Sequence, residues 1–165
     1  MELVIRAAIQ SDLDAVLAIE QASSTAAHWP RAQYESAIAD NGKLLLVAAL
    51  GHSVVGFLVA STAVQEWELE NIAVLPSARR HKTGSALMHA LISDGKRAGA
   101  TEIRQEIRAS NLAAQMLGQH AGFIQDGRRL DYYRDPQEDA LLFKYLLASA
   151  PESQKGAPGS SEDEC

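Results

Sequence analysis

The sequence predicts a mixed α/β fold, in which helices cover the faces of a sheet. Short β-rich segments, in which apolar residues alternate or run continuously, predict the strands. Longer segments with apolar residues at a spacing of three and four predict the helices. The two kinds alternate as β, α, α, β, β, β, α, β, α, β, β, an order typical of a sheet with helices on its faces.

Four segments carry the helical pattern. Ser11 is a good N-cap for the first, and the fixed φ of Pro30 suits the first turn of the second. The third ends at Gly99, and Ser110 is the expected cap of the fourth. The expected helices are residues 11–22, 30–39, 84–98 and 110–120.

Seven segments carry the strand pattern. Gly51-His52 lies between two of them and marks a hairpin. The residues that separate the last two strands, which include Tyr132 and Tyr133, are expected to form a loop. The expected strands are residues 3–6, 43–50, 53–62, 65–74, 101–108, 123–127 and 140–147.

Length and composition predict one domain, residues 1–148, followed by a disordered acidic tail rich in Ser, Gly and Pro, residues 149–165. The net charge of −6 argues against direct binding of nucleic acid, which needs a basic face. No apolar run reaches the ~18 residues of a membrane span. The N-terminus lacks a secretory pattern, so a cytoplasmic protein is expected.

Metal and disulfide chemistry are not expected. The single cysteine, Cys165, excludes an intrachain disulfide and a Cys-based zinc site. The five histidines are scattered without the spacing of a zinc-binding helix.

The segment from Asn71 to Gly84 indicates a phosphate site. An apolar strand ends at Val74, a basic turn follows, and a helix opens near Gly84. A turn that presents backbone N–H groups at a helix N-terminus binds anions. A basic surface turn without a ligand is the alternative.

Three blocks of residues carry a resemblance to a known family. The chain resembles the GCN5-related N-acetyltransferase superfamily over about residues 1–147, and within it the bacterial enzymes that acetylate the N-terminal alanine of a small-subunit ribosomal protein. The resemblance implies a central twisted, mostly antiparallel sheet flanked by helices, and acetyl-CoA as the acetyl donor. The blocks are residues 68–74 with 79–84, residues 106–111 with 113–114 and 122–123, and residues 131–133 with 138–140.

The resemblance also implies which residues bind acetyl-CoA. A bulged strand pairs its backbone with the pantetheine arm and turns unpaired N–H groups toward the thioester. Asn111 matches an asparagine that contacts CoA near the thioester, although a role at the helix start is an equal alternative. The implied residues are Ile72, Ala73 and Val74 on the strand, Arg79, Arg80, His81, Lys82, Thr83, Gly84 and Ser85 in the pyrophosphate turn, and Asn111.

Glu106 is the candidate general base. An α-amine has a pKa of about 7.7–8.0, so about a tenth of it is neutral at pH 7, and a glutamate acting through a water suffices to deprotonate it. Strand alternation places Glu106 on the face of Glu102 and Arg104. The alternative is an ion pair with Arg104 or Arg108. Glu68 is a second candidate base or a substrate-binding residue.

The sequence departs from the family pattern at three positions. Lys82 stands where the pyrophosphate turn has a glycine, and Gln105 where an apolar residue is usual. Gly118 stands where a tyrosine protonates the departing thiolate. Three explanations remain: the acid is dispensable or is a water, Tyr132 or Tyr133 supplies a hydroxyl, or catalysis is weak. The family also uses this tyrosine pair to line the acceptor pocket.

Three functions remain open at this level: acetylation of a protein N-terminus, acetylation of a small amine, and CoA binding with little catalysis. In the family, the loop of residues 23–29 commonly lines the acceptor groove. Whether the protein is a monomer or a homodimer is also open.

Overall fold

The computed structural model describes residues 1–147, apart from the side chain of Arg80. The expected tail, residues 149–165, lies outside the described residues. The elements are β1 (Leu3–Ala7), α1 (Leu13–Ala22), α2 (Arg31–Ala39), β2 (Lys43–Leu50), β3 (Ser53–Ser61), β4 (Glu66–Val74), α3 (Thr83–Ala98), β5 (Glu102–Arg108), α4 (Leu112–Ala121), β6 (Ile124–Tyr133) and β7 (Glu138–Leu146), with short 3-10 turns at Gln10–Asp12 and Pro76–His81.

All seven strands form one sheet in the order β1-β2-β3-β4-β5-β7-β6. Every neighbouring pair is antiparallel except β4 and β5, which are parallel. The mixed α/β fold and the mostly antiparallel sheet are therefore confirmed.

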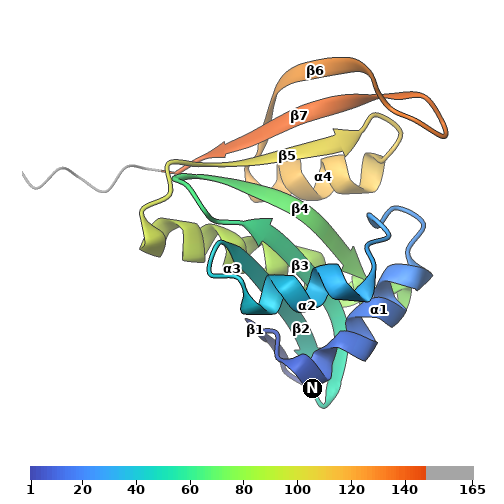
Figure 1. Ribbon diagram of the computed structural model, residues 1–165, viewed down its shortest axis with the longest axis vertical. Helices are drawn as coiled ribbons and strands as arrows, with labels where there is room; N and C mark the ends of the chain where they lie inside the picture. The colour runs from blue at the N-terminus through green and yellow to red at the C-terminus, as the bar shows by residue number, and fades with distance from the viewer. Residues whose placement is uncertain (148–165) are drawn as a thin grey trace, which may run out of the picture.

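Helices cover both faces of the sheet (Figure 1). On one face α1 and α2 pack on β2 and β3, around buried Tyr34, Phe57 and Val59. On the other face α3 and α4 pack over a larger core that includes Leu58, Leu87 and Ile103. Strands β2, β3 and β4 send side chains to both cores, as the apolar patterns predict.

A β-bulge at Glu70 interrupts β4. Asn71 pairs with Val59 and Leu69 pairs with Ala60, so Glu70 has no partner of its own on β3. The extra residue reverses the alternation of side chains along the strand. Trp67 and Leu69 before the bulge pack in the α3 core, and Ile72 and Val74 do so after it.

The bulge lies where β4 and β5 separate. Their parallel pairing runs from Glu66 and Glu102 to Leu69 and Gln105, where it ends. Beyond that pair β4 stays hydrogen-bonded to β3 and β5 to β7. Figure 1 shows the two strands side by side at one end and apart at the other. We call the opening between Glu70–Val74 and Glu106–Arg108 the fork.

Three local expectations were wrong. Ser11 does not cap α1: it lies in a 3-10 turn, and Asp12 instead accepts from the Ile9 N–H and pairs with Arg6 at 2.7 Å. Ser110 does not cap α4, because Asn111 does so by accepting from the Ala114 N–H at 3.1 Å.

The third concerns β6, which continues to Tyr133, so Tyr132 and Tyr133 belong to a strand and not to a loop. Pairing with β7 extends β6, and the window of residues around the tyrosines carries no signal of that distant partner.

Candidate active site

Two carboxylates lie at the closed end of the fork, where β4 and β5 begin to separate, on the α1–α2 side of the sheet. Glu68 comes from β4 and Glu106 from β5, and both alternate with side chains buried on the opposite face. The pKa of Glu68 is raised, first by partial desolvation and then by the negative charges of Glu106 and Glu70. Its side chain nevertheless remains open to solvent. A carboxyl with a raised pKa beside a second carboxylate is suited to bind and deprotonate an ammonium group.

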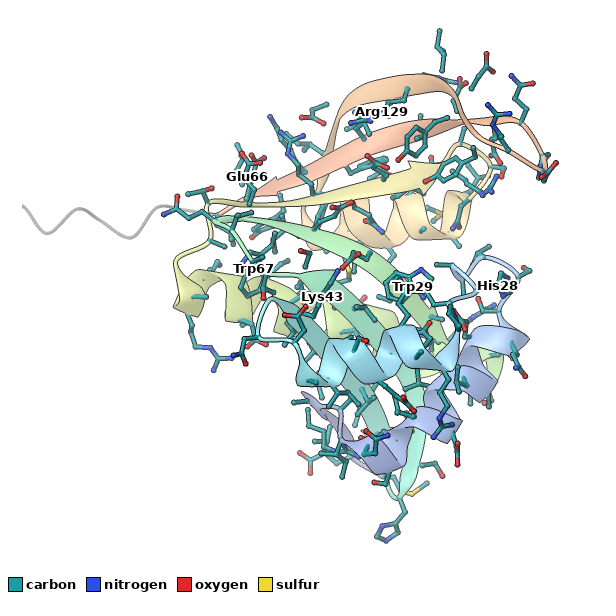
Figure 2. All side chains as sticks on the ribbon, in the orientation of Figure 1. His28, Trp29, Lys43, Glu66, Trp67 and Arg129 are labelled. Atoms are coloured by element: carbon teal, nitrogen blue, oxygen red, sulfur yellow. The ribbon has the colours of Figure 1, made fainter. Side chains whose placement is uncertain are left out.

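Glu106 forms its ion pair with a residue that the sequence did not suggest. Its Oε1 lies 3.7 Å from a guanidinium nitrogen of Arg129 on β6. The expected partners are both engaged elsewhere, since Arg104 pairs with Glu102 at 3.5 Å and Arg108 with Glu138 at 3.3 Å. The expected face of Glu106 is confirmed, and the alternative pairing with Arg104 or Arg108 is wrong. Figure 2 shows Arg129 on the outer hairpin, above the fork.

Tyr132 and Tyr133 come to the fork through an irregular stretch of β6. The register of β6 and β7 shifts between Arg129 and Tyr133, and Asp131 has a positive φ of 52°. The Asp139 carboxylate holds this turn by accepting from the Asp131 N–H at 2.8 Å. The two tyrosine rings pack edge to face, with 5.1 Å between their centres.

The tyrosines differ in their surroundings. The pKa of Tyr132 is raised mainly by the hydrogen bond of its hydroxyl with Glu106, and the pKa of Tyr133 mainly by burial. The Arg108 guanidinium covers the Tyr133 ring, 4.3 Å from its centre. Tyr132 is therefore the tyrosine whose pKa depends most on a candidate base, and Tyr133 is the more buried of the two.

A buried network, which sequence reasoning missed, fixes the segment between α1 and α2. Glu20 is 3% exposed and its Oε1 accepts from the Tyr34 hydroxyl at 2.6 Å and from the Trp29 N–H at 2.5 Å. Asn71 donates to the Tyr34 hydroxyl at 2.9 Å and accepts from the Ala27 N–H at 3.3 Å. The network thus joins the segment to the residue that follows the β4 bulge.

The sequence did hold one signal of this network. Glu20 follows Leu13 and Val16 by seven and four residues, so it lies on the apolar stripe of α1. A carboxylate at such a position is buried and needs hydrogen-bond donors. Their identity could not be read, because they come from distant segments.

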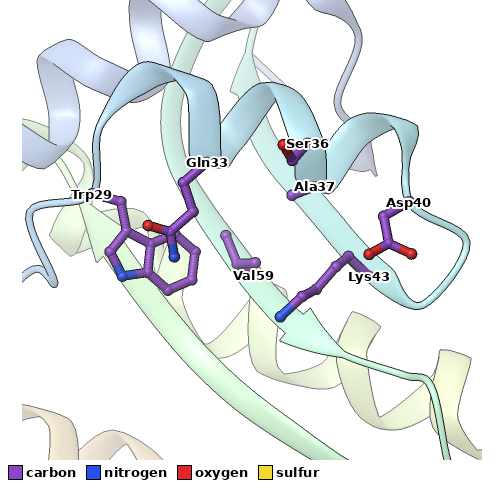
Figure 3. A pocket seen from close by; sticks show the side chains of 7 residues that line it. All are labelled: Trp29, Gln33, Ser36, Ala37, Asp40, Lys43 and Val59. Atoms are coloured by element: carbon purple, nitrogen blue, oxygen red, sulfur yellow. The ribbon is translucent and has the colours of Figure 1, made fainter.

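A small pocket adjoins the fork on the same face (Figure 3). It has a volume of about 90 Å³ and lies between α2 and strands β2 and β3. Its walls include the Trp29 indole and Val59, and Figure 3 shows the Lys43 side chain reaching along its floor. Lys43 pairs with Glu70, the bulge residue. The pocket is therefore connected to the fork through this ion pair.

The basic turn lies at the N-terminus of α3, as expected. Lys82, which stands in the place of a glycine, takes the left-handed conformation with φ 56° and ψ 33°. No side chain caps the helix and its first turn has no acidic residue. The backbone N–H groups at Thr83, Gly84 and Ser85 therefore lie at an uncapped helix N-terminus, which suits a phosphate.

The side chains of this turn differ in what they offer. Thr83 is fully buried and donates its hydroxyl to the Ala78 carbonyl at 2.9 Å, so only its backbone is available. A Cβ at Gly84 would lie 3.2 Å from Leu117 of α4, so the Leu117 side chain would have to shift to admit one. Arg79, His81 and Lys82 are exposed, and the Arg80 side chain lies outside the described part of the structure.

Gly118 and Gln105 lie next to each other at the closed end of the fork. Gly118 is buried in α4, and a Cβ there would lie 3.6 Å from Gln105 Oε1 and 3.7 Å from Phe123. Two of the three departures from the family pattern, Gln105 and Gly118, are thus neighbours in the fold. The side-chain carbonyl oxygen of Asn111 accepts the hydrogen bond that caps α4, which leaves the side-chain NH₂ group as a donor.

Within residues 1–147, no group of three His, Cys, Asp or Glu side chains is arranged to hold a metal ion. Among the same residues, no helix has both the length and the apolar character needed to cross a membrane.

Comparison with known proteins identifies relatives of the chain. The sequence model of the acetyltransferase (GNAT) family matches residues 13–123. The [ribosomal protein bS18]-alanine N-acetyltransferase of Escherichia coli (strain K12) is 36% identical over 88 residues, which are 52% of this chain and 60% of that enzyme. The protein named "Putative [ribosomal protein bS18]-alanine N-acetyltransferase" of Bacillus subtilis (strain 168) is 30% identical over 133 residues. These are 79% of this chain and 87% of that protein.

Solved structures agree with these relatives. The crystal structure of the E. coli ribosomal-protein-S18-alanine N-acetyltransferase matches with a TM-score of 0.80 at 29% identity, over 92% of this chain and 98% of that one. The structure of Ard1 from Thermoplasma volcanium also has a TM-score of 0.80, at 27% identity, over 89% of this chain and 99% of that one.

Proposed function

Since the chain belongs to the GNAT acetyltransferase family and is an acetyl-CoA-dependent N-acetyltransferase, we propose that its acceptor is the α-amine at a protein N-terminus, that of ribosomal protein bS18. The observation that carries this proposal is the pairing of Glu68 and Glu106 in the fork beside Tyr132 and Tyr133. An acceptor of this kind implies that the protein acts in the cytoplasm.

The carboxylates account for the choice of an α-amine. An α-ammonium has a pKa of about 7.7–8.0, against about 10.4 for lysine, so a carboxylate can deprotonate the former near neutral pH far more readily. Glu68 binds the incoming ammonium group, because it adds negative charge next to Glu106. Glu106 accepts the proton, directly or through a water. The raised pKa of Glu68 makes it the competing candidate for the base.

Tyr132 is the proposed proton donor. Its raised pKa, caused mainly by the nearby Glu106 carboxylate, keeps the proton on the hydroxyl oxygen. Gly118 has no side chain to serve as an acid. Tyr133, held under Arg108, forms a wall of the acceptor site together with the segment that Glu20 and Tyr34 fix.

Acetyl-CoA, when bound, supplies a thioester that the amine attacks. The described residues suit it in two respects: the edge of β4 that faces β5 has no strand partner from Ile72 to Val74, and the N-terminus of α3 is uncapped. The residues proposed to hold it are Ile72, Ala73, Val74, Arg79, Arg80, His81, Lys82, Thr83, Gly84, Ser85 and Asn111.

Release of thiol from acetyl-CoA tests the proposal across acceptors. We expect turnover with a peptide that carries the bS18 N-terminal sequence, and none with the same peptide blocked at its α-amine. Turnover with a small amine such as spermidine but not with the peptide would contradict it. Binding of acetyl-CoA without turnover of any amine would instead indicate a module with little catalysis.

A further inference from the structure

Gln105 is the one polar side chain of the described residues that is buried with an unsatisfied atom. The residue is 7% exposed, and its Oε1 has no hydrogen-bond partner in residues 1–147. Its neighbours on the same face of β5 are Ile103 and Ile107, which belong to the apolar core. A buried amide oxygen without a donor destabilises a folded protein, so its presence needs an explanation.

The position of Gln105 supplies one. The pair of Leu69 and Gln105 is the last of the β4–β5 ladder, so the side chain lies at the closed end of the fork. Gly118 of α4 faces the Oε1 atom, and a Cβ there would already be in van der Waals contact with it. A glycine inside a helix is itself unfavourable compared with alanine. Two locally unfavourable residues thus meet at one point, which is typical of a functional site.

We propose that Gln105 is a binding residue for the arm of acetyl-CoA, whose amide N–H donates a hydrogen bond to Oε1. The arm carries amide N–H groups and no other strong donors near the thioester, so it matches an orphaned acceptor. Gly118 leaves the space beside the oxygen free of a side chain, which a longer residue there would fill. The inference rests on the acetyl-CoA dependence of the proposed function and adds a side chain to a site otherwise made of backbone groups.

Calorimetric titration with acetyl-CoA tests this inference through Gln105→Leu, which keeps the bulk and removes the acceptor. We expect acetyl-CoA to bind the variant about 3- to 10-fold more weakly, the effect of one hydrogen bond. Adenosine 3′,5′-bisphosphate, which lacks the arm, should bind both proteins equally. Without ligand the variant should melt at a higher temperature than the wild type, because the unsatisfied atom is gone.

The controls separate the inference from the proposed function. Gln125→Leu makes the same change on β6, where the side chain is exposed, and should leave acetyl-CoA affinity unchanged. If the Gln105→Leu protein folds poorly, Gln105→Met provides a second variant with an apolar side chain at this position. Equal acetyl-CoA affinity of the wild type and either folded variant would overturn the role of Gln105 alone. Absence of acetyl-CoA binding to the wild type would overturn the proposed function with it.

Discussion

The Tyr34 hydroxyl donates a 2.6 Å hydrogen bond to the carboxylate of Glu20, and both residues are buried. The Trp29 N–H donates to Glu20, and the Ala27 N–H donates to Asn71, which in turn donates to Tyr34. This network fixes the backbone of the segment that joins α1 and α2, beside the fork. A loop held by buried hydrogen bonds is ordered before its ligand arrives, which favours binding.

Tyr34→Phe should therefore weaken acceptor binding. Loss of the hydroxyl removes one of the two donors to buried Glu20 and the acceptor of the Asn71 amide, which should lower the free energy of unfolding by about 1–3 kcal/mol. KM for the peptide should rise more than KM for acetyl-CoA, as steady-state kinetics would show. Tyr145→Phe, on the opposite face beside Phe123, is the matched control. Equal changes in both KM values would show that the network only stabilises the fold.

Glu68→Gln should stabilise the protein at neutral pH. The pKa of Glu68 is raised in the folded state, so the folded protein loses stability as the pH rises through that pKa. The variant does not ionise, so its gain in Tm should be largest near pH 7–8 and vanish as the pH falls below about 4.3, the ordinary value for glutamate. Thermal melts across this range measure it, with exposed Glu66→Gln as the comparison. A gain that does not depend on pH would rule out the electrostatic cause.

Lys82 allows the backbone and charge of the basic turn to be tested separately. Lys82→Gly should raise the free energy of unfolding by about 1 kcal/mol, because glycine adopts the left-handed conformation without cost. Lys82→Ala should give no such gain. If the ammonium group binds phosphate, both variants should bind acetyl-CoA more weakly, and the difference from wild type should shrink at high salt. Unchanged affinity in both would remove Lys82 from the site.

Much of the fold could be predicted from the sequence, since local signals decide it. Apolar alternation in β5 placed Glu106 on the correct face, and the hairpin at Gly51 and the helix stop at Gly99 were read from single residues. The basic turn before α3 was also found in this way.

The features of the site that could not be predicted depend on contacts between residues far apart in the sequence. Arg129 meets Glu106 only because β6 pairs with β7 and β7 with β5. Tyr34 meets Asn71 across 37 positions of the chain. Gly118 meets Gln105 only because α4 packs on β5. The sequence therefore could not show that these two departures from the family pattern adjoin each other.

The carboxylates of the fork are proposed to deprotonate a protein α-amine. Thiol release from acetyl-CoA with an alanine-starting peptide tests this most directly, measured for wild type, Glu106→Gln and Glu68→Gln from pH 6 to pH 9. We expect Glu106→Gln to lower kcat by about 100-fold or more, the usual contribution of a general base, and Glu68→Gln mainly to raise KM for the peptide. A large loss of kcat only in Glu68→Gln would exchange their roles, and wild-type turnover in both variants would contradict the claim.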